Sequence, residues 1–243
     1  MIDKPAGWTS HDVVAVARGI LGERHAGHGG TLDPLATGVL PLLVGQATKF
    51  VERLHTAPKV YAARVRFGHE TTTDDREGTP TRTALSPGHD RVASELAAFR
   101  GAIQQRPPAY AAVKVGGRRA YARARAGETV ELAAREVQVH RIDVARWSAD
   151  DEVTLLVVCS SGTYVRAIAR DLGRASGSAA HLAGLRRLAV GALDISDAVD
   201  VEGLRRGGRD AAIARLRPAN DLVLSIDPRY LAEPCPLLIP EGT

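Results

Sequence analysis

The sequence contains little cysteine and no long hydrophobic run. Only two of its 243 residues are cysteines, Cys159 in an apolar segment and Cys235 in a proline-rich one, which excludes a disulfide framework and cysteine-based zinc sites. No segment approaches the roughly 20 apolar residues that span a bilayer, and the N-terminal residues lack the apolar core of a signal peptide. We therefore expect a soluble protein of the reducing cytoplasm that folds without covalent crosslinks.

Signatures of nucleotide and metal binding are also missing. No Gly-Lys-Ser/Thr follows the glycines at 27, 29 and 30, and the dinucleotide-binding fingerprint is absent, which argues against an enzyme that binds phosphates in this turn. His25 and His28 form a His-x-x-His pair, but no third ligand occurs at a suitable spacing. The residues therefore argue against a metal site at this histidine pair.

Basic residues are present in excess, and they are unevenly placed. The formal net charge is +4, and 28 of the 32 basic residues are arginine. Residues 114–125 contain no acid, and they hold five of the cations: Lys114, Arg118, Arg119, Arg123 and Arg125. With Tyr110 and Tyr121 nearby, this stripe suits contacts to RNA phosphates and stacking on bases. The alternative is a solvated arginine-rich surface.

The hydrophobic pattern predicts a mixture of helices and strands. Alternation at 59–67 predicts a half-buried strand, with Tyr61 on its apolar side. The full set comprises helices at 11–21, 90–100, 164–175 and 179–187, strands at 59–67, 136–144 and 153–159, a loop at 69–90 and a basic linker at 205–210. Because the strand spacings are too short for regular βαβ crossovers, we expect an α+β fold with a mixed, largely antiparallel sheet and flanking helices.

Residues 27–41 hold one carboxylate, Asp33, between a glycine-rich turn and an apolar run. A residue that precedes proline is pushed toward extended backbone, so Pro34 stiffens the chain at Asp33. That placement suits a nucleophile. It equally suits a turn aspartate in a structural loop, because aspartate is common at turns.

Short motifs in a fixed order add specificity. They are Asp3 to Gly7, Thr9-Ser10, Gly27-His28, Gly30 to Gly38, Gly45, Ala47 to Lys49, Tyr61, Gly68, Thr71, Thr73, Asp75, Gly78, Gln105, Pro107-Pro108, Ala112 to Lys114, Gly117, Tyr121, Cys159 to Arg166, Asp171 to Gly173 and Leu185 to Arg187. In this order they resemble the TruB-type tRNA pseudouridine synthases over roughly four-fifths of the chain.

The resemblance implies a pseudouridine synthase fold and isomerisation of uridine 55 in the T-loop of tRNA, without metal or organic cofactor. The implied partner is the T-arm of tRNA, which would be bound by a monomer. A carboxylate can act as a covalent catalyst, and the resemblance gives this role to Asp33, which would attack either ribose C1′ or uracil C6.

Other roles follow from the same resemblance. Arg166 matches the arginine that pairs with the catalytic aspartate, and a nearby cation favours the ionised carboxylate. Tyr61 matches the tyrosine that stacks on the target base, and its hydroxyl is a candidate for proton removal. His28 matches the residue that fills the space left by the flipped base. Tyr164 and Leu185 match residues of the uracil pocket, and Lys4 matches a lysine that either supports neighbouring backbone or contacts substrate.

The chain departs from the family at both ends. Only Met1 and Ile2 precede the Asp-Lys-Pro motif, so the strand expected there is shortened or the true start lies upstream. We expect residues 1–195 to form the catalytic domain and residues 196–243 a short extension, too small for a full RNA-binding domain of the PUA type. A non-catalytic tRNA-folding chaperone with the same basic surface is the rival function, although it would not need Asp33, Tyr61 and Arg166.

Overall fold

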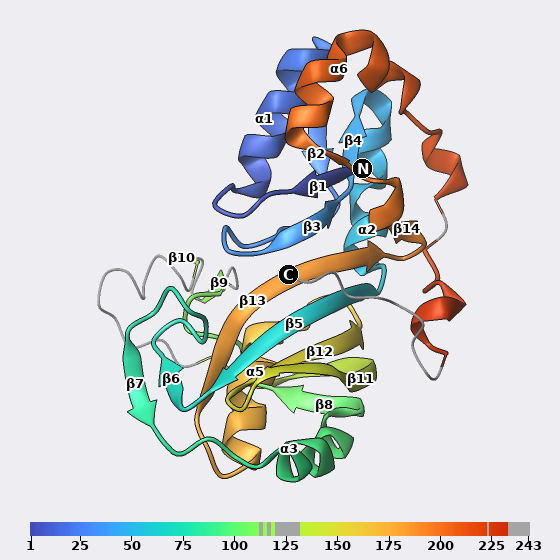
Figure 1. Ribbon diagram of the computed structural model, residues 1–243. Coiled ribbons are helices and arrows are strands. Elements are labelled where there is room, and N and C mark those ends of the chain that lie inside the picture. The colour runs from blue at the N-terminus through green and yellow to red at the C-terminus, as the bar shows by residue number, and fades with distance from the viewer. Residues whose placement is uncertain (112–113, 116–117, 120–131, 223, 233–243) are drawn as a thin grey trace. The chain divides into compact units, whose positions relative to one another are not determined.

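A computed structural model describes residues 1–111, 114–115, 118–119, 132–222 and 224–232 (Figure 1). The chain forms two compact units. Unit 1 contains Met1–Ala62 and the described residues from Leu185 onward, and unit 2 contains the described residues of Ala63–Gly184. In the described part of the chain, no helix is both long and apolar enough to cross a membrane.

Unit 1 joins the beginning of the chain to its end. Its elements are β1 (Ile2–Lys4), α1 (Ser10–Leu21), β2 (Ala26–His28), β3 (Thr37–Leu40), β4 (Leu42–Val44), η1 (Gly45–Phe50), α2 (Val51–Thr56), β14 (Leu193–Asp194), η3 (Ile195–Asp197), β15 (Val199–Asp200), α6 (Val201–Ala214), η4 (Ala219–Asp221) and η5 (Pro228–Tyr230), together with the beginning of β5 (Lys59–Phe67) and the end of β13 (Ala180–Val190). Strands run in the order β15-β1-β3-β13. β1 pairs antiparallel with β3, and β3 pairs parallel with β13.

Helix α1 confirms the helix expected at 11–21. Thr9 caps it in a capping box, because the Thr9 hydroxyl accepts from the Asp12 amide and the Asp12 carboxylate accepts from the Thr9 amide. Gly22 ends it in the left-handed conformation, with φ +66°. The apolar face of α1, which includes Val13 and Ala17, is buried.

Helix α6 corrects the expectation of a basic linker at 205–210. The Asp200 side chain accepts from the Gly203 amide and caps the helix, whose backbone becomes non-helical at Gly208. Leu204 and Ala212, on either side of this kink, belong to the same buried cluster as residues of α1. Figure 1 shows α6 beside α1. Burial of these apolar residues therefore holds a glycine-containing segment in a helix that its composition alone does not favour.

The chain beyond α6 returns to the sheet of unit 1. The buried Tyr230 hydroxyl donates to Asp194 Oδ2 at 2.7 Å, and Leu222 and Leu224 pack against the cluster that contains Val39 and Val190. Part of the segment expected to be a short extension thus shares the core of unit 1. The assignment of residues 1–195 as the catalytic domain stays a prediction.

Unit 2 is built on strands in the order β13-β5-β12-β11-β8. Its elements are β6 (His69–Thr71), β7 (Pro80–Thr83), α3 (His89–Glu95), η2 (Leu96–Phe99), β8 (Gly101–Gln105), β9 (Lys114–Val115), β10 (Arg118–Arg119), β11 (Arg135–Ala149), β12 (Glu152–Cys159) and α5 (Val165–Ala175), together with the end of β5 and the beginning of β13. β11 pairs antiparallel with both β12 and β8. The expected mixed, largely antiparallel sheet with flanking helices is confirmed.

Strand β13 shows that the helix predicted at 179–187 is wrong. Residues 180–184 are all buried, so the strand carries apolar residues on both faces instead of alternating. Such a run is compatible with a buried helix or a buried strand. In the structure it is a strand, because it pairs with β3 and β5 in the sheet. The loop expected at 69–90 also needs a smaller correction, because β6 and β7 form a short hairpin within it.

Candidate active site

Asp33 lies in unit 1, in the turn between β2 and β3, and main-chain bonds hold the residues beside it. The Gly7 amide donates to the Pro34 carbonyl at 2.8 Å. Ser10 Oγ donates to the Leu32 carbonyl at 3.2 Å and accepts from the Leu32 amide at 2.9 Å. Gly7, in the loop after β1, and Ser10, the first residue of α1, therefore fix the backbone on both sides of a half-buried carboxylate.

Lys4 is a buried residue that hydrogen-bonds the same turn. Its side chain is 0% exposed, and Nζ donates to the carbonyls of Pro5 at 2.8 Å, Trp8 at 2.7 Å and Pro34 at 3.4 Å. Burial lowers the pKa of Lys4 to about 8, while the negative charge of Asp33 acts in the opposite direction. Of the two roles expected for Lys4, these bonds favour support of backbone, and its charge also lies within reach of Asp33.

Arg187, in β13, is a site residue to which sequence analysis gave no role. The side chain is 1% exposed, and its guanidinium donates to the carbonyls of Val39 at 2.8 Å and Gly30 at 3.0 Å. Burial lowers the pKa of Arg187, and interaction with the Tyr61 hydroxyl acts in the opposite direction. Arg187 thus links the glycine-rich turn before Asp33 to the tyrosine expected to contact the base. Its place in the Leu-Arg-Arg motif was the available signal.

His28 lies at the end of β2. Its ring meets that of His11 edge to face, with 5.3 Å between centroids, and its Nδ1 is buried with no hydrogen-bond partner in the described part of the chain. Burial, with help from the charges of His11, His55 and Arg187, lowers the pKa of His28 to about 4. The ring is therefore neutral near pH 7. No cluster of three or more metal-ligating side chains occurs among the described residues, and the expected absence of metal stays a prediction.

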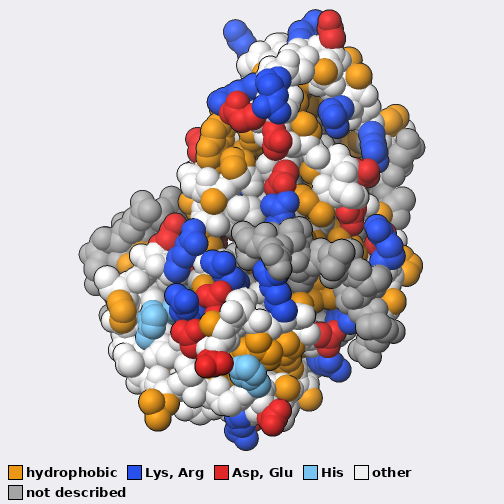
Figure 2. Space-filling view, viewed as in Figure 1, with side chains coloured by type: hydrophobic (Ala, Val, Ile, Leu, Met, Phe, Trp, Pro, Cys, Tyr) orange, Lys and Arg blue, Asp and Glu red, His pale blue; other side chains and the backbone are white. Residues whose placement is uncertain are grey.

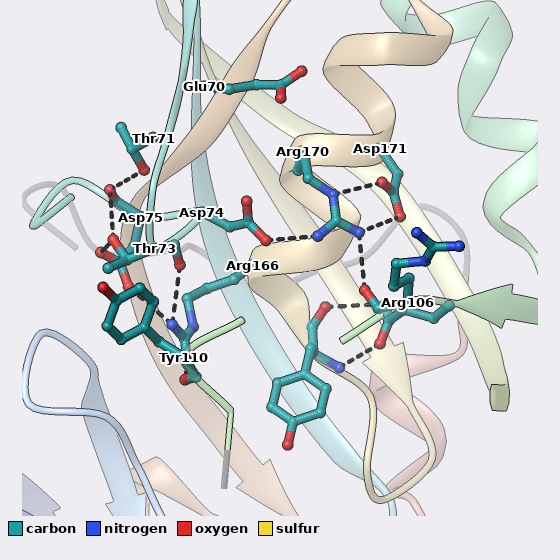
Figure 3. A network of polar contacts seen from close by, with 12 residues as sticks. Glu70, Thr71, Thr73, Asp74, Asp75, Arg106, Tyr110, Arg166, Arg170 and Asp171 are labelled. Carbon is teal, nitrogen blue, oxygen red and sulfur yellow. Dashed lines mark hydrogen bonds and ion pairs between the residues drawn. The ribbon is translucent and has the colours of Figure 1, made fainter. Parts of the chain in front are cut away.

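Arg166 lies in the first turn of α5, in unit 2, where its guanidinium is buried (Figure 3). Nη1 donates to the Thr73 carbonyl at 3.0 Å and to Asp75 Oδ2 at 3.3 Å, and Nη2 donates to the Tyr110 carbonyl at 3.1 Å. These contacts hold the planar guanidinium at several points, which lysine could not do. Because Arg166 and Asp33 belong to different units, their pairing stays a proposal.

Asp75 is a second residue without a role in the sequence analysis. Its Oδ1 accepts from Thr73 Oγ1 at 2.6 Å and from the Glu77 amide at 3.0 Å, while its carbonyl accepts from Thr71 Oγ1 at 2.6 Å (Figure 3). The carboxylate is therefore fixed by its own turn before it meets Arg166. Gly78 completes this turn, since a Cβ there would lie 2.4 Å from Thr73 Oγ1.

The remaining expected residues are distributed over both units. Tyr164 is half-buried and immediately precedes α5 in unit 2, while Leu185 is half-buried in β13 and belongs to unit 1. Lys114 is the register partner of Arg119 in the β9–β10 pair, which also includes Arg118, and Arg123 lies outside the described residues. On the face shown in Figure 2, Lys and Arg side chains are mixed with Asp and Glu.

Solved structures identify the class of this fold. A "Cbf5-Nop10-Gar1 Complex" matches with a TM-score of 0.69 and 30% identity over 90% of this chain. An "H/ACA RNP bound to a substrate RNA containing 2'-deoxyuridine" matches with a TM-score of 0.66 and 27% identity over 90% of this chain. This chain spans only 59% and 58% of those solved chains. The fold is that of the pseudouridine synthases.

Sequence comparisons define the family. The family model described as "TruB family pseudouridylate synthase (N terminal domain)" matches residues 18–165. Proteins named tRNA pseudouridine synthase B are 53% identical in Nocardia farcinica and 49% identical in Paenarthrobacter aurescens, each over 84% of this chain and 68% of the relative. The relative in Thermobifida fusca is 49% identical over 84% of this chain and 73% of its own length. The chain belongs to the TruB family of pseudouridylate synthases, and so it is an enzyme that isomerises uridine in RNA.

Proposed function

We propose that this chain converts uridine 55 in the T-loop of tRNA to pseudouridine. The observation that carries the proposal is the turn at Asp33, a half-buried carboxylate whose flanking backbone is held by Gly7, Ser10 and Lys4. The relatives named tRNA pseudouridine synthase B support tRNA as the substrate. The T-arm as the bound region, a monomeric enzyme and action in the cytoplasm are further parts of this proposal.

The reaction needs a covalent catalyst, because the base must leave C1′ through N1 and return through C5. Asp33 forms a covalent bond to ribose C1′ or to uracil C6, and the bond between N1 and C1′ breaks. The uracil then rotates, a bond forms between C5 and C1′, and the bond between Asp33 and C1′ or C6 breaks, which regenerates the free carboxylate. The proton that leaves C5 is balanced by one gained at N1, so the product is an isomer of the substrate and no cofactor is consumed.

The neighbouring side chains take distinct parts in this proposal. Tyr61 stacks on the target base, and its hydroxyl, which interacts with Arg187, is the candidate for proton removal. Arg166 keeps the Asp33 carboxylate ionised and oriented in the RNA-bound enzyme. His28, being neutral near pH 7, fills the space that the flipped uridine leaves, and Leu185 lines the uracil pocket with Tyr164.

The test is turnover of an unmodified tRNA transcript, followed by site-resolved detection of pseudouridine. Wild-type protein should modify the T-loop uridine, and Asp33→Asn should bind the transcript with similar affinity and form no product. Tyr61→Phe separates stacking from proton transfer, since near-normal turnover would leave stacking as the only role. Arg166→Lys should bind tRNA normally and react much more slowly, because lysine cannot keep the same contacts.

The rival function gives a different pattern. A tRNA-folding chaperone would bind the transcript with both wild-type and Asp33→Asn protein and produce no pseudouridine with either. It would also accelerate refolding of a misfolded transcript, which can be followed by aminoacylation of the tRNA. The high identity to proteins named as synthases favours catalysis over this alternative.

A further inference from the structure

Gln105 is a buried residue whose side-chain amide hydrogen-bonds a single residue through both of its polar groups. It ends β8 and is 2% exposed, whereas its neighbour Gln104 is exposed. Gln105 Nε2 donates to the Tyr164 carbonyl at 3.0 Å, and the Tyr164 amide donates to Gln105 Oε1 at 2.7 Å. This two-point contact fixes the peptide groups on both sides of Tyr164 and therefore the direction of its side chain.

Arg135 holds the ring of the same tyrosine. It is paired with Gln105 across β11 and β8, so the two residues lie side by side. The guanidinium carbon lies 4.8 Å from the centre of the Tyr164 ring, within the range of a cation–π contact, and Nη2 donates to the Gly162 carbonyl. With one ring face covered by Arg135, the opposite face and the edge are the parts that can contact a base.

The two residues are not required to attach α5 as a whole. Arg170, one turn beyond Arg166, pairs with Asp74 at 2.7 Å, and Arg174 pairs with Glu70 at 2.6 Å. These ion pairs tie the helix to the segment that contains β6. The side chains of Gln105 and Arg135 instead contact residues 162–164, just before the helix begins.

We propose that Gln105 and Arg135 are positioning residues that set the orientation of the Tyr164 ring against the target uracil. The inference rests on the proposed function, because Tyr164 is placed in the uracil pocket by resemblance. Gln105 fixes the backbone of Tyr164 and Arg135 fixes its ring. As a consequence, the Tyr164 ring has its final orientation before RNA binds, and the target base contacts a ring that is already ordered.

The first test is Gln105→Met, which keeps the size of the side chain and removes both hydrogen bonds. Its matched control is Gln104→Met on the same strand. Single-turnover pseudouridine formation should slow by about 10- to 100-fold in Gln105→Met, the range expected for a small misplacement of a reacting group. The dissociation constant for tRNA should change by less than about 2-fold, and Gln104→Met should match wild type in both measurements.

A double-mutant cycle distinguishes positioning from general structural support. In a Tyr164→Ala background the ring is gone, so Gln105→Met should lower the rate by less than about 2-fold further. Equal losses in the two backgrounds would overturn the inference. If Gln105→Met does not fold, Arg135→Gln serves in the same cycle, with Arg146→Gln on β11 as its control.

Failure of this inference can be told apart from failure of the proposed function. If wild-type protein forms no pseudouridine in tRNA, the proposed function falls and the inference falls with it. If wild type and Gln104→Met react normally and Tyr164→Ala is slow, but Gln105→Met and Arg135→Gln react at the wild-type rate, only the positioning role is wrong. The inference is supported if Gln105→Met and Arg135→Gln each slow the reaction of the otherwise wild-type enzyme but cause no further slowing in the Tyr164→Ala background.

Discussion

At the scale of single residues, the turn before and after Asp33 is organised by two buried cations. Lys4 and Arg187 each donate to main-chain carbonyls, at Pro34 on one side of the aspartate and at Gly30 on the other. Because a buried carbonyl that loses its donor is costly, these side chains stabilise one conformation of the turn. The charge of Lys4 also acts on the Asp33 carboxylate.

Arg187→Lys should therefore destabilise the protein more than Arg186→Lys, the same substitution at the neighbouring position. Lysine cannot reach the Gly30 and Val39 carbonyls together, so we expect a loss of about 1–3 kcal/mol in the free energy of unfolding, measured with urea. The control is Arg186→Lys, since Arg186 pairs with Asp3 at 2.6 Å and lysine can keep an ion pair there. Equal losses in the two variants would contradict the role given to Arg187.

His28 should make stability depend on pH in a defined direction. Its pKa in the folded protein is about 4, below the ordinary value of 6.5. Between these two values the unfolded chain binds a proton that the folded protein does not, so stability falls as the pH is lowered through this window. Wild type should lose more stability than His28→Gln between about pH 6.5 and pH 4.5.

The matched control for this pH effect is His25→Gln, because the His25 side chain is 84% exposed. Urea unfolding of the three proteins at several pH values measures the difference. The difference between His28→Gln and wild type should exceed the difference between His25→Gln and wild type. Parallel curves for wild type and His28→Gln would show that His28 titrates normally in the folded state.

At the scale of elements, the sequence predicted α1, β5, β11, β12 and α5, where periodicity and end signals agree. It failed at β13 and α6, where tertiary contacts decide. β13 is buried on both faces, and α6 is held by its packing with α1 despite Gly207 and Gly208. The resemblance supplied the candidate residues, but Arg187, Asp75 and Gln105 act through contacts with residues far away in sequence, which no local pattern encodes.

The pairing of β3 with β13 depends on a glycine. Gly38 has φ +104°, and a Cβ there would lie 2.2 Å from the Arg187 carbonyl oxygen. Gly38→Ala should therefore destabilise the protein through both backbone strain and a backbone clash, each of about 1–3 kcal/mol. Gly22→Ala is the control, since Gly22 has φ +66° and an added Cβ there would have no atom within 4 Å.

Thermal unfolding measures the loss of stability in each of these two glycine variants, and the difference between the two losses gives the cost of the clash at Gly38. Gly22→Ala should report the cost of left-handed backbone alone, which is about 1–2 kcal/mol. The loss in Gly38→Ala should be clearly larger, and turnover should fall with it because Arg187 lies in the paired strand. If the two substitutions cost the same, close packing at Gly38 is not important for stability.

At the scale of the whole molecule, charge is the property that bears on RNA. A net charge of +4 is small for an RNA-binding protein, and Figure 2 shows both signs mixed on the visible face. Affinity for tRNA must then come from local groups of cations more than from the overall charge. The basic stripe at residues 114–125 remains the strongest such group in the sequence.

The salt dependence of tRNA binding tests this stripe. Each phosphate contact steepens the dependence of log affinity on log salt by about 0.7 to 0.9. Changing Lys114, Arg118 and Arg119 to Gln should make the slope less steep by about 2 to 3, while turnover at saturating tRNA stays near wild type. A second triple variant changes the exposed Arg205, Arg206 and Arg215 to Gln and removes the same net charge. If net charge alone governs binding, the two variants will show the same dependence of log affinity on log salt. If the stripe contacts phosphates directly, only the first variant will show a less steep dependence.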